Sequence, residues 1–218
     1  MEANKISVMS RSDLVQLVEK QELLVSYPWM KIASSYFGIK RMAGKRRSNP
    51  TIDEFIASGF GCTIPEHRRP QLSFREKLQR VITAPSPVYQ ASISFAIKND
   101  LNPNSCTKDQ EKYIQDETSW CSAFANHVMK SCGYSGTNHL GARSWLTWGQ
   151  AIDKENPPFG AIVIFSRGTN PRNGHVGFYV GKNGDDYKIL GGNQSPHSLV
   201  CVRHYSTKTL LKFRWPAT

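Results

Sequence analysis

The hydrophobic pattern of the chain changes its period near residue 160, and this change constrains the fold more than any other feature of the sequence. Before it, apolar residues recur at helical spacing in residues 12–25, 28–38, 51–58, 88–100 and 121–132, and residues 142–149 have the pattern of a short amphipathic helix. After it, four runs alternate like strands, at residues 161–166, 175–181, 187–192 and 199–205. Helices followed by a meander of strands predict an α+β fold with one antiparallel sheet.

Some of the predicted helices carry signals at their ends. Pro28 stands in the first turn of residues 28–38, and Gly38 ends that helix. Thr51 followed by Glu54 predicts a capping box at the start of residues 51–58. Residues 60–115 are largely turn-rich and contain nothing that suggests chemistry, so we expect a lid or an insertion there.

The chain is basic, with 28 Lys and Arg against 17 Asp and Glu and a net charge of +11. One local cluster stands out, formed by Lys40, Arg41, Lys45, Arg46 and Arg47. Such a cluster favours an anionic partner, such as a cell-wall polymer or an acidic protein, although a solvated loop explains it as well. The usual nucleic-acid-binding motifs are absent from the sequence, so we expect no nucleic-acid partner.

The chain contains five cysteines: Cys62, Cys106, Cys121, Cys132 and Cys201. This number is too small for a disulfide scaffold, and because it is odd at least one thiol stays free. If the protein works outside the cytoplasm, one or two bridges among the four cysteines other than Cys121 remain open alternatives. The spacing of Cys121, His127, Cys132 and His139 is not a known zinc pattern, so we expect no metal.

Segments that address proteins to membranes are missing from the sequence. No run approaches the ~18 apolar residues that a membrane-spanning helix needs. The N-terminal residues MEANKISVMSRSDLVQL lack the long apolar region of a signal peptide. We therefore expect a chain without a transmembrane segment, made in the cytoplasm and carried to its place of action by another route.

Two residues stand at the positions expected of a cysteine nucleophile and its base. Cys121 stands where a polar loop gives way to a helical pattern, and His175 opens a run that alternates like a strand. A helix N-terminus lowers the pKa of a thiol and offers free N–H groups that can hold a developing oxyanion. An imidazole on a neighbouring rigid element can then move the protons. The sequence predicts that these two side chains meet.

A third polar group must fix the tautomer of the histidine. Asn193 ends the strand after His175, and the end of one antiparallel strand lies beside the start of its partner. We therefore expect Asn193 to orient the ring, with Gln194 as the alternative. Trp120, Gly174 and Gln194 flank these residues in the sequence and are our candidates for substrate contacts.

Other residues of the same types have simpler explanations. Cys132 and Cys201 read as inert, packed thiols, and His127 lies six residues into the Cys121 helix, where it packs or faces solvent. Trp145 and Trp148 are expected in the core rather than in a groove.

Seven blocks of the sequence carry a family resemblance. They are PWMKIASSYFGIKRMAGKRRSNPTIDEFIASGF, DETSWCSAFANHVMKSCGY, ARSWLTWGQ, PPFGAIVIFSRG, GHVGFYVG, LGGNQ and FRWP. In this order they resemble the CHAP and NlpC branch of the papain-like cysteine amidases and endopeptidases, which are cell-wall hydrolases of phages and bacteria. The resemblance covers about residues 28–59 and 116–216. Ser119 stands where family members commonly have proline, and residues 60–115 read as an insertion.

The resemblance implies a papain-like core, in which N-terminal helices and a Cys-bearing helix pack on an antiparallel sheet of about four to six strands. It implies Cys121 as nucleophile, His175 as base and Asn193 as orienting residue, with no cofactor. The expected domains are an N-terminal helical extension, residues 1–27, and a hydrolase domain, residues 28–218, with the insertion at about 60–115.

The implied function is a peptidoglycan amidase or endopeptidase acting through a thioester, in the periplasm or cell wall. Two settings fit: a phage lysin, and an antibacterial effector toxin with a cognate immunity protein and a secretion-machine carrier. We expect a monomer. The alternatives are a non-catalytic wall-binding or structural phage protein with the same fold, and a cysteine-dependent acyltransferase or deamidase.

Overall fold

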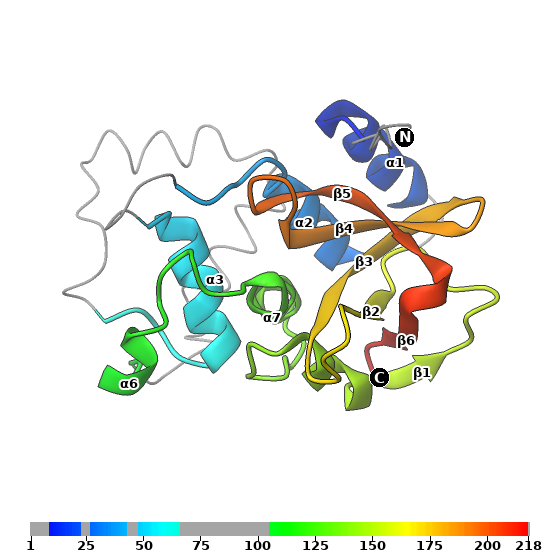
Figure 1. Cartoon of the computed structure of the whole chain (residues 1–218). Coiled ribbons are helices and arrows are strands. Elements are labelled where there is room, and N and C mark those ends of the chain that lie inside the picture. The colour runs from blue at the N-terminus through cyan, green and yellow to red at the C-terminus, as the bar shows by residue number, and fades with distance from the viewer. Residues whose placement is uncertain (1–8, 23–26, 43–47, 66–104, 218) are drawn as a thin grey trace, which may run out of the picture.

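The computed structural model of the chain describes residues 9–22, 27–42, 48–65 and 105–217. It contains an antiparallel six-stranded sheet with helices packed against it, and Figure 1 shows helices α3 and α7 grouped on one side and the strands on the other. The predicted α+β fold, with a Cys-bearing helix on an antiparallel sheet, is therefore confirmed. The helix predicted at residues 88–100 lies outside the described residues.

The helices precede the strands, as the change of period predicts. They are α1 (Arg11–Glu22), α2 (Pro28–Ser35), α3 (Pro50–Phe60), α6 (Lys108–Glu111) and α7 (Cys121–Ser131). Residues 142–149 form a shorter element than expected, a 3-10 helix over Ala142–Thr147. A second 3-10 turn covers Thr207–Thr209.

The strands are β1 (Gln150–Ile152), β2 (Ile162–Ser166), β3 (Gly174–Asn183), β4 (Asp186–Gln194), β5 (Leu199–Ser206) and β6 (Leu210–Trp215). They lie in the order β1-β6-β2-β3-β4-β5, and each neighbouring pair is antiparallel. The meander β2 to β5 follows the four predicted strands. The chain then returns to the other edge, where β6 pairs with β2 and β1 pairs with β6.

The start of α3 differs from the predicted capping box. The helix begins one residue earlier, at Pro50, and its N-cap is Asn49, whose side chain accepts the N–H of Thr51 at 3.0 Å. The prediction that Thr51 caps the helix is therefore wrong. An asparagine before a proline at the first helical position satisfies the same free N–H groups.

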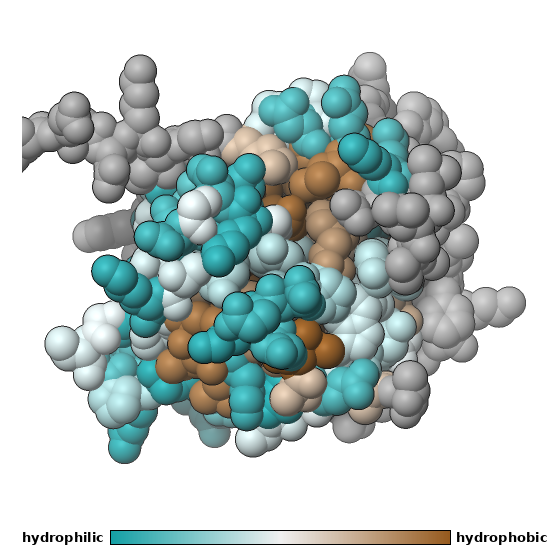
Figure 2. All heavy atoms as spheres, turned by 90° about the vertical axis from the view of Figure 1, so that its right-hand side faces the viewer, coloured by the Kyte–Doolittle hydropathy of each residue, from teal (hydrophilic) through white to brown (hydrophobic). Residues whose placement is uncertain are grey.

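The two faces of the sheet pack differently. One face, with Val176, Phe178 and Leu190, joins the helices in the main core, which also includes Leu14 and Val18 of α1. The boundary predicted at residue 27 stays a prediction, although α1 contributes to this core. The other face holds a smaller apolar cluster: Ala161, Val163, Phe165, Tyr187, Ile189 and Phe213. Figure 2, which faces the right-hand side of Figure 1, shows apolar patches separated by hydrophilic side chains.

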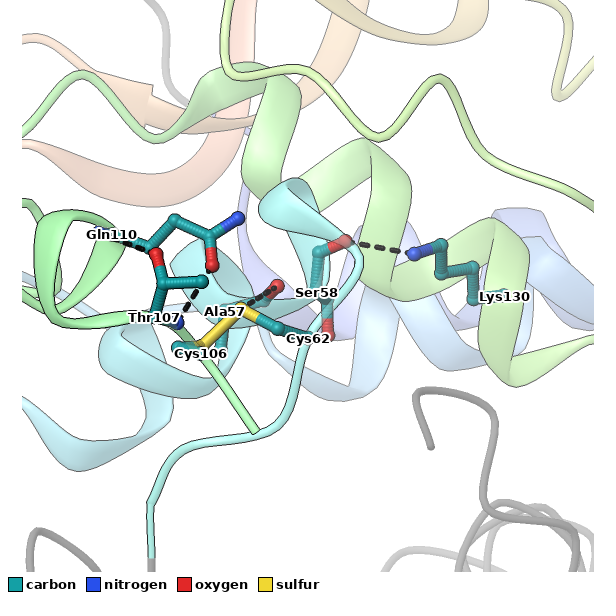
Figure 3. The surroundings of a disulfide bond; sticks show 7 residues. All are labelled: Ala57, Ser58, Cys62, Cys106, Thr107, Gln110 and Lys130. Atoms are coloured by element: carbon teal, nitrogen blue, oxygen red, sulfur yellow. Dashed lines mark hydrogen bonds between the residues drawn. A yellow bond between two sulfur atoms is a disulfide. The ribbon is translucent and has the colours of Figure 1, made fainter. Parts of the chain in front are cut away.

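A disulfide bond joins Cys62, after the end of α3, to Cys106, before the start of α6. The bond, shown in Figure 3, closes a loop of 44 residues. The Cys106 N–H also donates to the Thr63 carbonyl at 3.0 Å. Cys121, Cys132 and Cys201 are free thiols. Of the bridges left open by the sequence, the structure contains the one between the two cysteines that bracket residues 63–105.

Candidate active site

Cys121 is the first residue of α7, and Trp120 at the N-cap makes no capping hydrogen bond with its side chain. The N–H groups at the start of a helix have no partner within the helix. The backbone N–H groups of Val176, Ser122 and Cys121 itself lie close enough to the sulfur to lower the pKa of the thiol. Val176 follows His175 in β3, so the cysteine lies against the strand that carries the candidate base.

Burial has the largest effect on Cys121. The residue is only 6% exposed, and this desolvation raises the pKa of the thiol above its ordinary value, although the N–H groups and the charge of Arg167 lower it. The sequence suggested a thiol made acidic by its helix. In the structure, burial raises the pKa of the thiol by more than the N–H groups lower it, because a thiolate is destabilised when it is removed from water.

His175 is 3% exposed and faces the smaller apolar cluster, opposite Phe165 of β2. Burial lowers the pKa of His175 to about 3, and the nearby charge of Arg167 lowers it further. The nearby side chain of Gln194 acts in the opposite direction and raises the pKa of His175 in part. At neutral pH the His175 imidazole is therefore neutral and the Cys121 thiol is protonated.

A bulge in β4 shapes the space next to the histidine. The pairing of β3 with β4 runs from Asn183 and Asp186 to Phe178 and Leu190, and the β4–β5 register shifts between Gly191 and Gln194. The first residues of β3, before Phe178, therefore form no ladder pairs with β4. A Cβ added to Gly191 would lie 3.2 Å from His175 Nε2 and 3.4 Å from the Gln194 amide nitrogen. The bulge thus brings Gln194 beside the ring.

The structure treats the two candidates for the orienting residue differently. Gln194 is 1% exposed, and its amide nitrogen donates to backbone carbonyls of Ile189, Gly191 and Cys201. Asn193 is half-buried, with a left-handed backbone (φ 56°), and its side chain makes no hydrogen bond within the described part of the chain. The geometry therefore favours the alternative, Gln194, while a role for Asn193 stays a prediction.

The other predicted site residues are placed as follows. Trp120 is fully buried, and its ring would lie 2.5 Å from a Cβ at Gly192, so it packs between α7 and β4. Gly174 is half-buried at the start of β3, where a Cβ would lie 2.9 Å from the Phe165 carbonyl oxygen. In the described residues, His175 Nε2 is buried and has no hydrogen-bond partner, and Cys121 is a free thiol. Their substrate contacts stay predictions.

Asp116 holds the segment that leads to Cys121, a role that the sequence did not reveal. The residue is 1% exposed, and one carboxylate oxygen accepts the N–H groups of Met42 at 2.8 Å and Asn49 at 2.9 Å. The Asp116 N–H donates to the Ser48 hydroxyl at 2.9 Å. These bonds tie the start of the Cys helix to the residues before α3, because a buried carboxylate needs such donors.

The remaining cysteines and histidines have ordinary structural roles. Burial raises the pKa of Cys132 to about 12 and that of Cys201 to about 11, which agrees with packed, inert thiols. His127 bonds to the hydroxyls of Tyr36 at 2.9 Å and Ser58 at 3.1 Å. Trp145 is buried and donates to Ser122 at 2.9 Å. Among the described residues, no cluster of His, Cys, Asp and Glu could hold a metal ion.

Residues 113–193 match the family model of the CHAP domain. Over this segment the chain is similar to CHAP domains. The matched segment includes Cys121 and His175 and ends at Asn193, so it runs from the loop before α7 to the bulge in β4. CHAP domains belong to a family of peptidoglycan amidases and endopeptidases that use cysteine and histidine. A search of curated proteins gave no match to the chain.

This match confirms the resemblance to CHAP-type cell-wall hydrolases. Members of the CHAP family act on peptidoglycan. No helix in the described ranges is long and apolar enough to cross a membrane. Sequence reasoning missed two further residues beside the site, Arg167 and Tyr205. Arg167 follows the last residue of β2 and Tyr205 lies near the end of β5, and no motif distinguishes them from other surface or core residues.

Proposed function

We propose that this CHAP protein hydrolyses an amide bond of peptidoglycan, with Cys121 as nucleophile and His175 as general base and acid. The observation that carries the proposal is the Cys121 sulfur at the start of α7, against the N–H of the residue that follows His175. Gln194 is our candidate for the residue that orients the ring, because it is buried beside His175 at the bulge.

The neutral resting pair determines how the protons move. Cys121 gives its proton to His175 as the sulfur attacks the carbonyl carbon, and the carbonyl oxygen becomes an oxyanion. N–H groups at the start of α7 can hold this oxyanion, an effect of about 3–4 kcal/mol per donor. His175 then protonates the leaving amine, which leaves a thioester on Cys121. A water deprotonated by His175 hydrolyses the thioester and restores the thiol.

We infer that the enzyme acts in an oxidising compartment, such as the periplasm or the cell wall. The disulfide between Cys62 and Cys106 supports this, because such bonds persist in oxidising surroundings and are rare in the reducing cytosol. The site of action fits both an antibacterial effector, with its immunity protein and carrier, and a phage lysin. A gene for a small acidic secreted protein directly downstream would favour the effector, and a neighbouring holin gene would favour the lysin.

The direct test is digestion of purified sacculi by the wild-type protein and by Cys121→Ala. We expect the wild type to release soluble fragments and the variant to release none above background. Cys132→Ala is the matched control, because it removes another free thiol, at the C-cap of α7. This variant should digest sacculi like the wild type. Equal digestion by Cys121→Ala and the wild type would exclude the proposed nucleophile. Binding of sacculi without digestion would favour the non-catalytic alternative.

A further inference from the structure

Tyr205 of β5 covers one face of the His175 ring. The two rings are stacked, with their centroids 4.9 Å apart and their planes 8° from parallel. Tyr205 also stacks on Phe165, the cross-strand neighbour of His175, at 4.9 Å and 20°. An imidazole in contact with a ring that is itself held has few orientations open to it, because buried side chains are close-packed.

The hydroxyl of the same tyrosine holds the second partner of the histidine. It donates a hydrogen bond of 2.8 Å to Gln194 Oε1. Burial raises the pKa of Tyr205, so the phenol keeps its proton and stays a donor. The Gln194 amide nitrogen is bound to backbone carbonyls, and the tyrosine therefore fixes the other end of the side chain. A buried amide with both ends bonded keeps one orientation.

We propose that Tyr205 is a positioning residue for His175: its ring stacks on the imidazole, and its hydroxyl holds Gln194 beside it. The proposal rests on the proposed function, and it adds a residue of β5 that lies beyond the segment matching the CHAP family. Tyr205 touches no reacting atom in this scheme. It acts by keeping the ring plane in which His175 exchanges protons with Cys121 and with the leaving amine.

Several charged or titratable groups lie near Tyr205 and His175, and they influence how activity and alkylation depend on pH. Cys121 is the first residue of α7 and Arg167 follows the last residue of β2, while Cys201 and Arg203 belong to β5 itself. Of these, Arg167 also acts on His175 and Cys121. The substitutions chosen below leave all four unchanged.

The test compares Tyr205→Phe, which keeps the ring and removes the hydroxyl, with Tyr205→Leu, which removes both contacts. Tyr179→Phe is the matched control, because Tyr179 lies on the same face of the sheet but packs against Tyr187 and Phe213 instead. Two readouts are needed. One is kcat and KM on a soluble peptidoglycan fragment, and the other is the rate at which iodoacetamide alkylates Cys121 between pH 5 and 10, measured by peptide mass spectrometry.

We expect Tyr205→Leu to lower kcat by about 10- to 100-fold, since misplacement of a catalytic group by about 1 Å costs up to about 100-fold. We expect Tyr205→Phe to lower kcat by about 3- to 10-fold, the loss of one hydrogen bond. KM should stay within about twofold in both, because uniform substrate binding is untouched. The alkylation profile of Cys121 should shift in both variants and stay unchanged in Tyr179→Phe.

The inference is wrong if both Tyr205 variants match Tyr179→Phe in kcat and in the alkylation profile. If Tyr205→Leu does not fold by circular dichroism, Tyr205→Phe decides alone, through the shift of its alkylation profile or the absence of one. If the wild type cleaves no peptidoglycan, the proposed function fails, but the alkylation profiles still decide whether Tyr205 positions His175.

Discussion

Removal of the Cys62–Cys106 disulfide is the perturbation whose effect on stability follows most directly from the structure. The bond closes a loop of 44 residues. In the chain-entropy description, a cross-link over such a loop removes about 13 cal/mol/K of conformational entropy from the unfolded chain, or about 4 kcal/mol at 25 °C. The free energy of unfolding of a domain is about 5–15 kcal/mol, so this one bond supplies a large part of it.

The assay is thermal unfolding of the wild type and of the double variant Cys62→Ser/Cys106→Ser, each with and without a phosphine reductant. A change of 1 kcal/mol shifts the Tm of a chain of this size by about 2–4 °C, so the oxidised wild type should melt about 8–16 °C above the double variant. The reductant should lower the Tm of the wild type toward that of the double variant. It should leave the Tm of the double variant unchanged, because the three other thiols are free.

An equal Tm for the oxidised wild type and the double variant would refute this reasoning. It would mean that the cross-link between Cys62 and Cys106 does not lower the conformational entropy of the unfolded chain as calculated. A drop in Tm as large in Cys132→Ser as in the double variant would equally refute it, since Cys132 forms no bridge.

Two further predictions concern the site. Burial lowers the pKa of His175 to about 3, whereas a histidine in the unfolded chain titrates near 6.5, so the unfolded state binds a proton first as pH falls. The contribution of His175 to the free energy of unfolding is therefore fully present above about pH 6.5. It decreases as the pH falls from about 6.5 to about 3, by up to about 1.4 kcal/mol per pH unit. Urea unfolding of His175→Gln should show a shallower loss, and an identical slope in both proteins would contradict the burial of a neutral imidazole. In the second prediction, Gly192→Ala should destabilise the fold by about 1–3 kcal/mol, because the new Cβ would lie 2.5 Å from the Trp120 ring and 2.7 Å from Phe124 Cβ. Ser195→Ala, at an exposed position just after β4, is the control, and equal Tm values for the two variants would show that β4 is not packed on α7 as described.

The long periodic segments of this chain could be predicted from the sequence. The Cys121 helix and the strands from β2 to β5 follow patterns of apolar residues that only one arrangement buries. The strands β1 and β6 were not predicted as strands. Gln150–Ile152 is short and mostly exposed, and Leu210–Trp215 shows two exposed residues in a row, so neither has a clean alternation.

The finer parts of the site depend on register, which a single sequence does not fix. A bulge between Gly191 and Gln194 decides that Gln194, rather than Asn193, is buried beside His175, since a shift of one residue reverses the face of a strand. The stacking of Tyr205 on His175 joins β5 to β3 across β4, and no local motif predicts it. The pairing of Cys62 with Cys106 likewise depends on the positions of two distant segments.

The pKa of the Cys121 thiol likewise depends on features that the sequence does not show. Its place at a helix start was predicted, and the structure confirms that α7 begins at this residue. The sequence could not show how little water reaches the sulfur, which is what raises the pKa of the thiol. We therefore expect a proton transfer to His175 that accompanies the attack, rather than a preformed thiolate and imidazolium.

The central claim is our proposal that Cys121 is the nucleophile that cleaves an amide bond of peptidoglycan. Mass spectrometry of the soluble material released from sacculi tests it most directly, because it identifies the bond that is broken. We predict fragments with a new amine and a new carboxylate at one amide linkage, produced by the wild type and absent with Cys121→Ala. Fragments from a broken glycosidic bond, or the same amide products from Cys121→Ala, would contradict the claim.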